Sequence, residues 1–79
     1  MKLEILTPEK TVFEGNINSI SVTGTKGSFT VLKNHAPIIS TLEKGKIKII
    51  TDTNKIEFIE IPGGILEVKK NSIIVLTDL

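Results

Sequence analysis

The sequence predicts an all-β protein, an antiparallel β-sandwich or flattened barrel of about ten strands. Fourteen isoleucines, five valines and nine threonines occur among the 79 residues, whereas alanine occurs once. Such β-branched side chains favour strands over helices. Turn-forming residues recur every eight to twelve residues or so, as sandwiches and barrels require. No segment shows the i, i+3, i+4, i+7 apolar pattern, so no helix is expected.

Alternation of apolar and polar residues identifies the clearest strands. Residues 2–5, 19–23 and 46–49 alternate strictly, which is typical of strands with one face toward a core. Turn signals separate these strands and the weaker ones; they lie at residues 7–10, 14–16, 24–27, 33–35, 43–45, 52–55, 62–64 and 69–71. The resulting pattern predicts about nine or ten short strands.

Two segments depart from this alternation. Between Phe58 and Ile59 the apolar phase slips, which indicates either a bulge or a strand covered on both faces. Residues 73–76 are all apolar, so both faces of that strand are apolar. Because an antiparallel sandwich leaves one face of each sheet in water, the surplus face needs a cover from this chain or from a partner. This segment is the strongest indication of an interface.

Size and composition bound the possible functions. Residues 1–79 are expected to form one domain with a small core, too short to carry a separate catalytic domain. The chain has no cysteine, which excludes disulfides and thiol chemistry. Its ten basic residues are all lysine and balance nine acids to a net charge of +1. Without arginine, bidentate phosphate capture and phosphoryl transfer are not expected.

The candidates for chemistry favour structural roles. His35 is the only histidine, and with two aspartates and no cysteine it cannot build a metal cage or advertise a catalytic triad. Gly24 and Gly27 lack the frame of a P-loop and predict a tight connection in which both adopt positive φ. We therefore expect no catalytic residue, metal or cofactor, and a structural or interface role for His35.

Two other classes of protein are the alternatives. A small barrel that binds nucleic acid is disfavoured, because Lys44, Lys46, Lys48 and Lys55 have no arginine, tyrosine or tryptophan beside them. Lysines that alternate with isoleucines are ordinary on the solvent face of a strand. A free-standing enzyme would need a concave pocket that holds His35 beside a carboxylate.

Two segments carry a resemblance to a known family. Residues 22–38 join glycine-flanked turns to Asn-His-Ala-Pro, and residues 62–68 read Pro-Gly-Gly-Ile-Leu-Glu-Val. They resemble the amino-terminal domain of the rotary ATP synthase epsilon subunit, over nearly the whole chain. Asn34 stands where that family usually has glycine, and Ser28 where it commonly has an acidic residue, which puts the usual charged contact with the rotor ring in doubt.

The resemblance implies a non-catalytic central-stalk subunit of a proton-translocating ATP synthase. It implies two partners, the gamma subunit and the membrane c-ring, with no nucleic acid and no direct membrane insertion. The expected c-ring residues, all at one end of the sandwich, are Thr25, Lys26, Gly27, Ser28 and His35. The expected gamma-facing residues, with Val12 as an exposed apolar side chain, are Thr7, Val12, His35 and Ser40.

The chain is not expected to enter a membrane by itself. No apolar run approaches the roughly 20 residues that span a bilayer. By resemblance the protein lies at the cytoplasmic face of the bacterial inner membrane, held there through the complex. Family members often continue into a carboxy-terminal helical hairpin, which has no counterpart in these 79 residues. The chain is then either a naturally short subunit or a fragment, and we expect neither a brake on ATP hydrolysis nor ATP binding from it.

Overall fold

The computed structural model of the chain describes residues 1–78, which form eight strands and no helix. The all-β class and the lack of a helix agree with the prediction from sequence. In chain order the strands are β1 (Lys2–Leu6), β2 (Thr11–Gly24), β3 (Gly27–Leu32), β4 (Ile38–Leu42), β5 (Gly45–Thr51), β6 (Ile56–Ile61), β7 (Gly64–Lys69) and β8 (Ser72–Thr77). Over this described range there is accordingly no helix able to cross a membrane.

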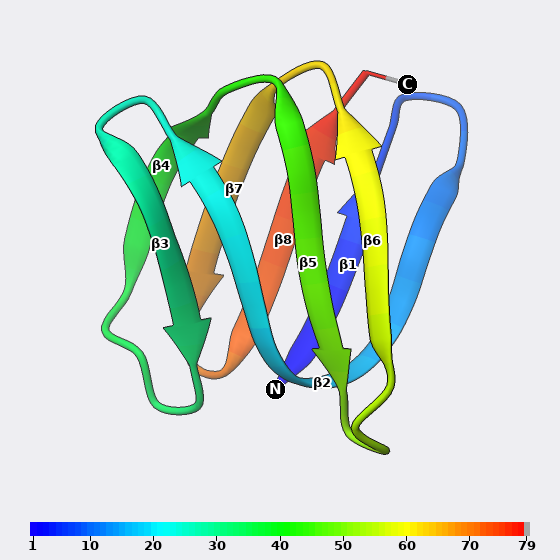
Figure 1. Cartoon of the computed structure of the whole chain (residues 1–79), viewed down its shortest axis with the longest axis vertical. Helices are drawn as coiled ribbons and strands as arrows, with labels where there is room; N and C mark the ends of the chain where they lie inside the picture. The colour runs from blue at the N-terminus through cyan, green and yellow to red at the C-terminus, as the bar shows by residue number, and fades with distance from the viewer. Residues whose placement is uncertain (79) are drawn as a thin grey trace.

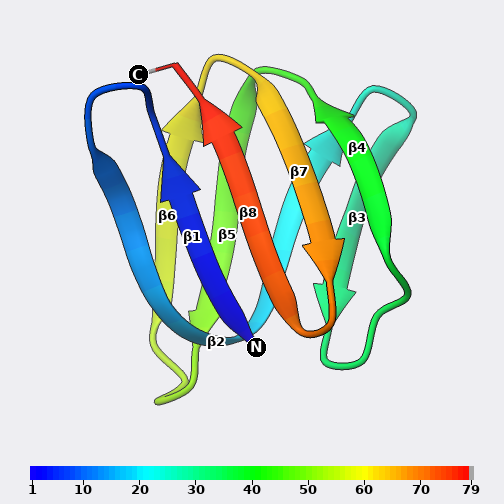
Figure 2. The same ribbon diagram turned by 180° about the vertical axis from the view of Figure 1, so that it is seen from behind.

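The strands fold into two layers that face each other across the core. One layer holds β3, the second half of β2, β5 and β6, and it faces the viewer in Figure 1. The other layer holds β4, β7, β8 and β1 with the first half of β2, and it is in front in Figure 2. All strands belong to one hydrogen-bonded sheet, because β2 pairs with both layers. The predicted flattened barrel is therefore confirmed.

The strand β2 explains why the chain has fewer strands than predicted. The turn expected at residues 14–16 does not form, because Glu14, Gly15 and Asn16 pair with β1 in regular register. One strand of 14 residues thus replaces two shorter ones. The prediction of nine or ten strands is wrong in this detail: eight are present within residues 1–78.

A bulge at Asn18 lets β2 serve both layers. Ile17 pairs with Thr51 and Ser19 with Ile50, so Asn18 is an extra residue on β2. Because one extra residue reverses the alternation, Ile17 and Ile20 both point into the core although they are three positions apart. The bulge keeps the inner face apolar as β2 passes from one layer to the next.

The pairing of β1 with β8 is parallel, a departure from the purely antiparallel sandwich expected. The register runs in the same direction from Lys2 beside Ser72 to Leu6 beside Leu76. These strands come from the two ends of the chain, so no short connection forces them to run in opposite directions. All other pairings among the described strands are antiparallel.

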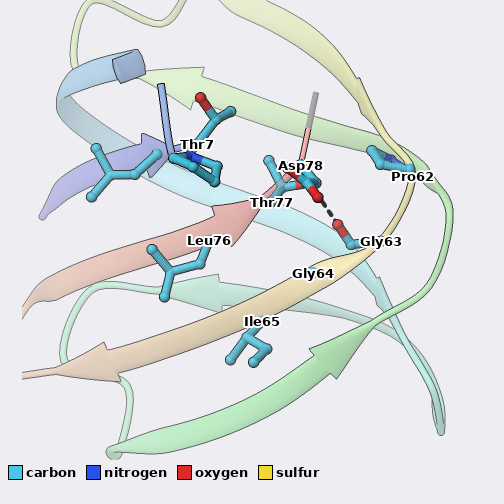
Figure 3. Close-up of a pocket in the computed structure, with 10 residues that line it drawn as sticks. Thr7, Pro62, Gly63, Gly64, Ile65, Leu76, Thr77 and Asp78 are labelled. Carbon is cyan, nitrogen blue, oxygen red and sulfur yellow. Dashed lines mark hydrogen bonds between the residues drawn. The ribbon is translucent and has the colours of Figure 1, made fainter. Parts of the chain in front are cut away.

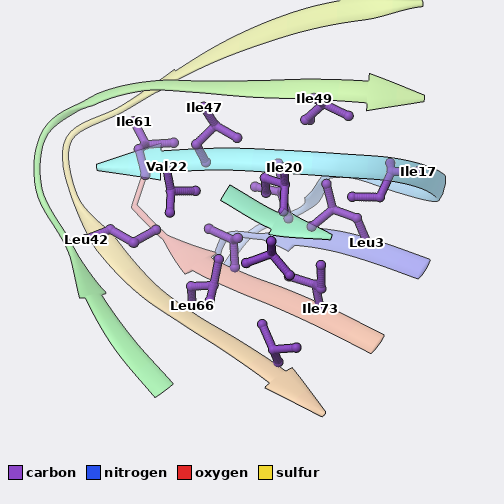
Figure 4. Packing of buried hydrophobic residues seen from close by; sticks show 14 residues of the cluster. Leu3, Ile17, Ile20, Val22, Leu42, Ile47, Ile49, Ile61, Leu66 and Ile73 are labelled. Atoms are coloured by element: carbon purple, nitrogen blue, oxygen red, sulfur yellow. The ribbon is translucent and has the colours of Figure 1, made fainter. Parts of the chain in front are cut away.

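The core consists of aliphatic side chains from both layers, which point toward one another in Figure 4. They are Leu3, Ile5, Ile17, Ile20, Val22, Val31, Leu42, Ile47, Ile49, Ile61, Leu66, Val68, Ile73 and Val75. Most come from strands in which every second residue points inward. No buried side-chain nitrogen or oxygen within residues 1–78 lacks a hydrogen-bond partner.

The two irregular segments of the sequence have different outcomes. The pairing of β6 with β5 is regular over its whole length, so the predicted bulge is absent. Ile56 and Phe58 instead point outward and are 56% and 61% exposed, so the alternative of a cover on both faces also fails within this chain. In β8, Ile73 and Val75 lie in the core, whereas Leu76 faces out and is half exposed, as the all-apolar run indicated.

Gly64 starts β7 at a crowded point where its neighbours are Leu42 of β4 and Thr77 of β8. A Cβ on Gly64 would collide with the carbonyl oxygen of Leu76. We expect Gly64→Ala to lower the free energy of unfolding by about 2 kcal/mol, which corresponds to a fall in Tm of roughly 10 °C. Thermal unfolding followed by circular dichroism measures this loss.

Gly15→Ala is the matched control for this prediction. Its added Cβ would meet only the ring of Phe13 at 3.7 Å, an ordinary contact. Its Tm should stay within a few degrees of the parent value. Equal losses in the two variants would show that strand glycines matter for a reason other than the backbone approach at Gly64.

Candidate partner-binding surfaces

The loop at residues 25–28, here the 25–28 loop, is a hairpin connection that is tied to the neighbouring β4. Gly27 adopts φ +120°, as predicted. Gly24 does not have positive φ, and that part of the prediction is wrong. Gly24 is small for another reason, because an added Cβ would lie 3.0 Å from the ring of Phe29 and 3.3 Å from Ser40 Oγ. The Thr25 N–H donates to Thr41 O at 3.1 Å, which fixes the loop against β4.

The turn at residues 33–35, here the 33–35 corner, forms as expected at the end of β3. Asn34 adopts φ +66°, a conformation that asparagine tolerates better than most residues. The His35 N–H donates to Leu32 O at 3.1 Å and closes the turn. His35 Nδ1 lies 2.7 Å from Ala36 O. Because a carbonyl oxygen only accepts, Nδ1 is the donor in this hydrogen bond.

The His35 side chain makes no hydrogen bond or ion pair with another side chain in the part of the chain that the structure describes. It is half-buried, and its ring nitrogen bonds only the adjacent backbone. No group of three histidine, aspartate or glutamate residues within positions 1–78 could hold a metal ion. The geometry of the corner therefore presents His35 as a partly exposed side chain whose ring bonds only the adjacent backbone.

The 25–28 loop and the 33–35 corner do not lie at one end of the sandwich, contrary to the prediction. Gly24 pairs with Gly27 at one end of β3, and the corner follows Leu32 at the other end. Figure 1 shows the loop at the top and the corner at the bottom. At about 3.3 Å per residue, the strand between them separates the two by about 17–20 Å. His35 cannot share a small contact surface with Thr25, Lys26, Gly27 and Ser28.

The expected gamma-facing residues also divide into groups. Thr7 lies in the β1–β2 connection, and Val12 at the start of β2, on one flank of the back layer. Ser40 lies in β4, on the opposite flank, and the 33–35 corner leads into that strand. Strands β8 and β7 separate the two flanks. The structure thus brings His35 and Ser40 to the same flank but not Thr7 and Val12.

Val12 is not the exposed apolar residue that the sequence analysis expected. The register of β2 against β1 shifts from Phe13 opposite Ile5 to Thr11 opposite Leu6, so Val12 is the extra residue of a second bulge. Its side chain is half-buried and packs against the core. The bulge accounts for the packing of Val12, because strict alternation from Phe13 would place this side chain on the outside.

The outer face of the back layer carries an apolar surface that sequence reasoning identified only in part. A row of side chains crosses this layer through Leu6, Leu76 and Ile65, which are paired neighbours on β1, β8 and β7. Ile65 is 47% exposed, and Ile39 on β4 is 74% exposed. Leu6, Leu76 and Ile65 help to line a shallow, mainly apolar depression of about 690 Å³. Figure 3 shows Ile65 and Leu76 among the residues that line it, and the Thr77 hydroxyl donates to Gly63 O at 2.6 Å.

The outer face of the front layer carries a second apolar surface. Pairing places Leu32, Ser19, Ile50 and Ile56 in one row across β3, β2, β5 and β6. Phe58 lies in the next row, beside Lys48. Leu32, Ile56 and Phe58 are each more than half exposed. The signal for this surface was present in the sequence as the phase slip near Phe58, but the slip did not tell which side is uncovered.

The fold and these surfaces define a small β-sandwich with two exposed apolar faces. Comparison with known proteins identifies its family: the chain belongs to the ATP synthase delta/epsilon chain β-sandwich domains, whose family model matches residues 1–79. The resemblance inferred from residues 22–38 and 62–68 is thereby confirmed.

Individual relatives agree with this assignment. The chain is 38% identical over 78 residues to an ATP synthase epsilon chain of Leptospira interrogans, and the alignment covers 99% of this chain and 61% of that relative. It is 41% identical over 76 residues to the ATP synthase epsilon chain of Chlorobaculum tepidum, with 96% of this chain and 86% of that one covered. The chain thus spans less than two thirds of the Leptospira relative.

Two solved structures have the same fold. A chain in the mitochondrial ATP synthase of Euglena gracilis (OSCP, F1 and c-ring) matches with a TM-score of 0.89 at 18% identity, over 95% of this chain and 48% of that one. A chain in the central stalk and c-ring of the Tetrahymena thermophila mitochondrial ATP synthase matches with a TM-score of 0.82 at 20% identity, over all of this chain and 63% of that one.

The packing of Val12 against the core leads to a test of its role. We expect Val12→Asp to lower the free energy of unfolding by about 2 kcal/mol, because it brings a carboxylate into a half-buried apolar site. Thr11→Asp, at the exposed neighbouring position, is the control and should change stability little. Urea unfolding of both variants measures the difference. A fully stable Val12→Asp variant would contradict the packing seen in the structure.

Proposed function

We propose that the chain is a non-catalytic central-stalk subunit of a proton-translocating ATP synthase, where it links the gamma subunit to the c-ring. In this role it is held at the cytoplasmic face of the bacterial inner membrane through its partners. It supplies a rigid two-layer wedge and takes no part in chemistry. The family assignment supports the complex, and the two exposed apolar faces support a subunit that is partly covered by other proteins.

The observation that carries the proposal is the amount of apolar surface on a domain of this size. Six large apolar side chains, from Leu32 to Leu76, are between 47% and 74% exposed. The strand register places three of them on each outer face, where Ile65 pairs with Leu76 in the back layer and Ile56 and Phe58 share the outer face of β6 in the front layer. Single exposed apolar residues are ordinary, but grouped ones mark surfaces for other proteins.

The separation of loop and corner gives the proposal an orientation. We assign the c-ring contact to Thr25, Lys26, Gly27 and Ser28. These residues form the polar loop that connects β2 to β3 at the tip of their hairpin. We assign His35, at the opposite end of β3, to the gamma side. Ser40 lies on the same β4 flank but beside the 25–28 loop, so we place it where the two contacts meet. Thr7 and Val12, on the opposite flank, would meet the same partner only if it wrapped around the back layer.

A pull-down from solubilised membranes tests the complex itself. A tagged version of the chain should retain the gamma subunit and c-ring subunits at stoichiometric yield. The same tag on an unrelated β-sandwich of similar charge is the control. Recovery of the chain without either subunit would contradict the proposed function.

Cysteine crosslinking tests the orientation. Because the chain has no cysteine of its own, a single introduced thiol is the only reactive site in it. Lys26→Cys and Ser28→Cys should crosslink to a cysteine in the polar loop of the c-ring within the assembled complex. Thr53→Cys, in the β5–β6 turn at the opposite end, is the matched control and should not. Crosslinks from Thr53→Cys alone would show that the sandwich is inverted on the ring.

A further inference from the structure

The 33–35 corner is joined to the β7–β8 hairpin by two hydrogen bonds between asparagines. The Asn34 N–H donates to Asn71 Oδ1 at 2.9 Å. Asn71 Nδ2 donates in return to Asn34 Oδ1 at 3.3 Å. The orientation of the Asn71 amide follows from the first bond, because a backbone N–H requires an acceptor opposite it. The two residues are 37 positions apart in the chain and come from different layers of the sandwich.

The backbone of Asn71 is itself fixed from two directions. Lys70 and Asn71 have φ values of 49° and 61°, and Lys69 pairs with Ser72 around them. Two successive residues with positive φ are the signature of a type I′ hairpin, which suits asparagine at the second position. In addition, the Lys2 N–H donates to Asn71 O at 3.0 Å. Asn71 is therefore a rigid junction of β1, the β7–β8 hairpin and the corner.

The corner has little else to hold it in place. Leu32, Asn34, Ala36 and Pro37 are exposed, and only His35 is half-buried. The Leu32–His35 hydrogen bond closes the turn internally but does not fix it relative to the back layer. The asparagine pair supplies the connection across the open end between the layers.

We propose that Asn71 is a positioning residue, which holds the 33–35 corner through Asn34 in the orientation that a partner contacts. The two Asn34–Asn71 hydrogen bonds, here called the clamp, do not depend on the proposed function. The partner contact rests on the proposed gamma-side role of His35. A corner that is already ordered loses less conformational entropy when a partner binds it. The expected consequence of losing the clamp is weaker binding with an intact fold.

Three variants of the full chain separate the parts of the clamp. Asn71→Gly keeps the positive φ of the turn but removes both side-chain bonds. Asn71→Asp keeps an acceptor for the Asn34 N–H, and Asn34→Gly keeps that N–H and removes only the second bond. The matched control is Asn54→Gly. Asn54 also has positive φ (64°), and its Oδ1 accepts an exposed hydrogen bond of 3.0 Å from Asn18 Nδ2.

Two measurements follow the clamp and its consequence. Amide hydrogen exchange by NMR should show the Asn34 N–H exchanging roughly two- to tenfold faster in Asn71→Gly, the effect of one net hydrogen bond. Asn71→Asp and Asn34→Gly should retain most of the protection. The dissociation constant for the purified gamma subunit should rise by roughly the same factor in Asn71→Gly, and Asn71→Asp should restore most of the affinity.

The outcomes are distinct for the clamp and for the proposed function. Unchanged exchange at Asn34 in Asn71→Gly would overturn the clamp. Equal weakening of gamma binding by Asn54→Gly would overturn its specific role in positioning the corner. If the unaltered chain does not bind the gamma subunit, the proposed function fails, and the exchange measurement still decides whether Asn71 holds the corner.

Discussion

The architecture depends on one strand that belongs to both layers. β2 pairs with β1 in the back layer and with β3 and β5 in the front layer, and its inner face has to remain apolar throughout. Asn18 makes this possible by adding one residue between Ile17 and Ile20. A strand in strict alternation would turn Ile20 and Val22 toward water after the crossing, and the front layer would lose its share of the core. The exposed faces and the positions of both loops follow from this geometry.

Much of the fold could be predicted from the sequence, because its main signals are local. β-branched composition and the spacing of turns indicated the sandwich, and seven of the eight turn signals fall between observed strands. The failure at residues 14–16 has a physical cause, since glycine and asparagine within a strand look like a turn until their partners are known. The informative cue was the phase change from Ile17 to Ile20, which marks a bulge. The β1–β8 pairing is nonlocal and leaves no local signal.

The candidate surfaces could be predicted less well. The 25–28 loop and the 33–35 corner are close in sequence, but a complete strand lies between them, so proximity in the chain became separation in space. The hydrogen bonds between Asn34 and Asn71 could not be predicted either, because only the packing of two layers brings these residues together. Apolar side chains such as Ile39 and Leu32 could not be recognised as exposed from hydrophobicity alone, because the same residue types fill the core.

Electrostatic attraction contributes little to this architecture. One ion pair, Lys2 with Glu14 at 3.5 Å, occurs in the described part of the chain, and both side chains are more than half exposed. Such a pair is worth little because water and salt screen it. The loops are held mainly by backbone and amide hydrogen bonds, whose strength depends only weakly on ionic strength.

The parallel pairing of β1 with β8 has a consequence for synthesis of the chain. β1 is completed on one side by β8, with all the other described strands between them in sequence, so the back layer cannot close until β8 has left the ribosome. Before that point β1 can form only a hairpin with β2, and an isolated hairpin is marginally stable in water. Closing the back layer therefore requires strands that are distant in sequence to pair, and such pairing is typical of slowly folding topologies. Until β8 has emerged, the isoleucine-rich inner face of β1 lacks part of its cover, and exposed apolar strands of this kind are prone to aggregate.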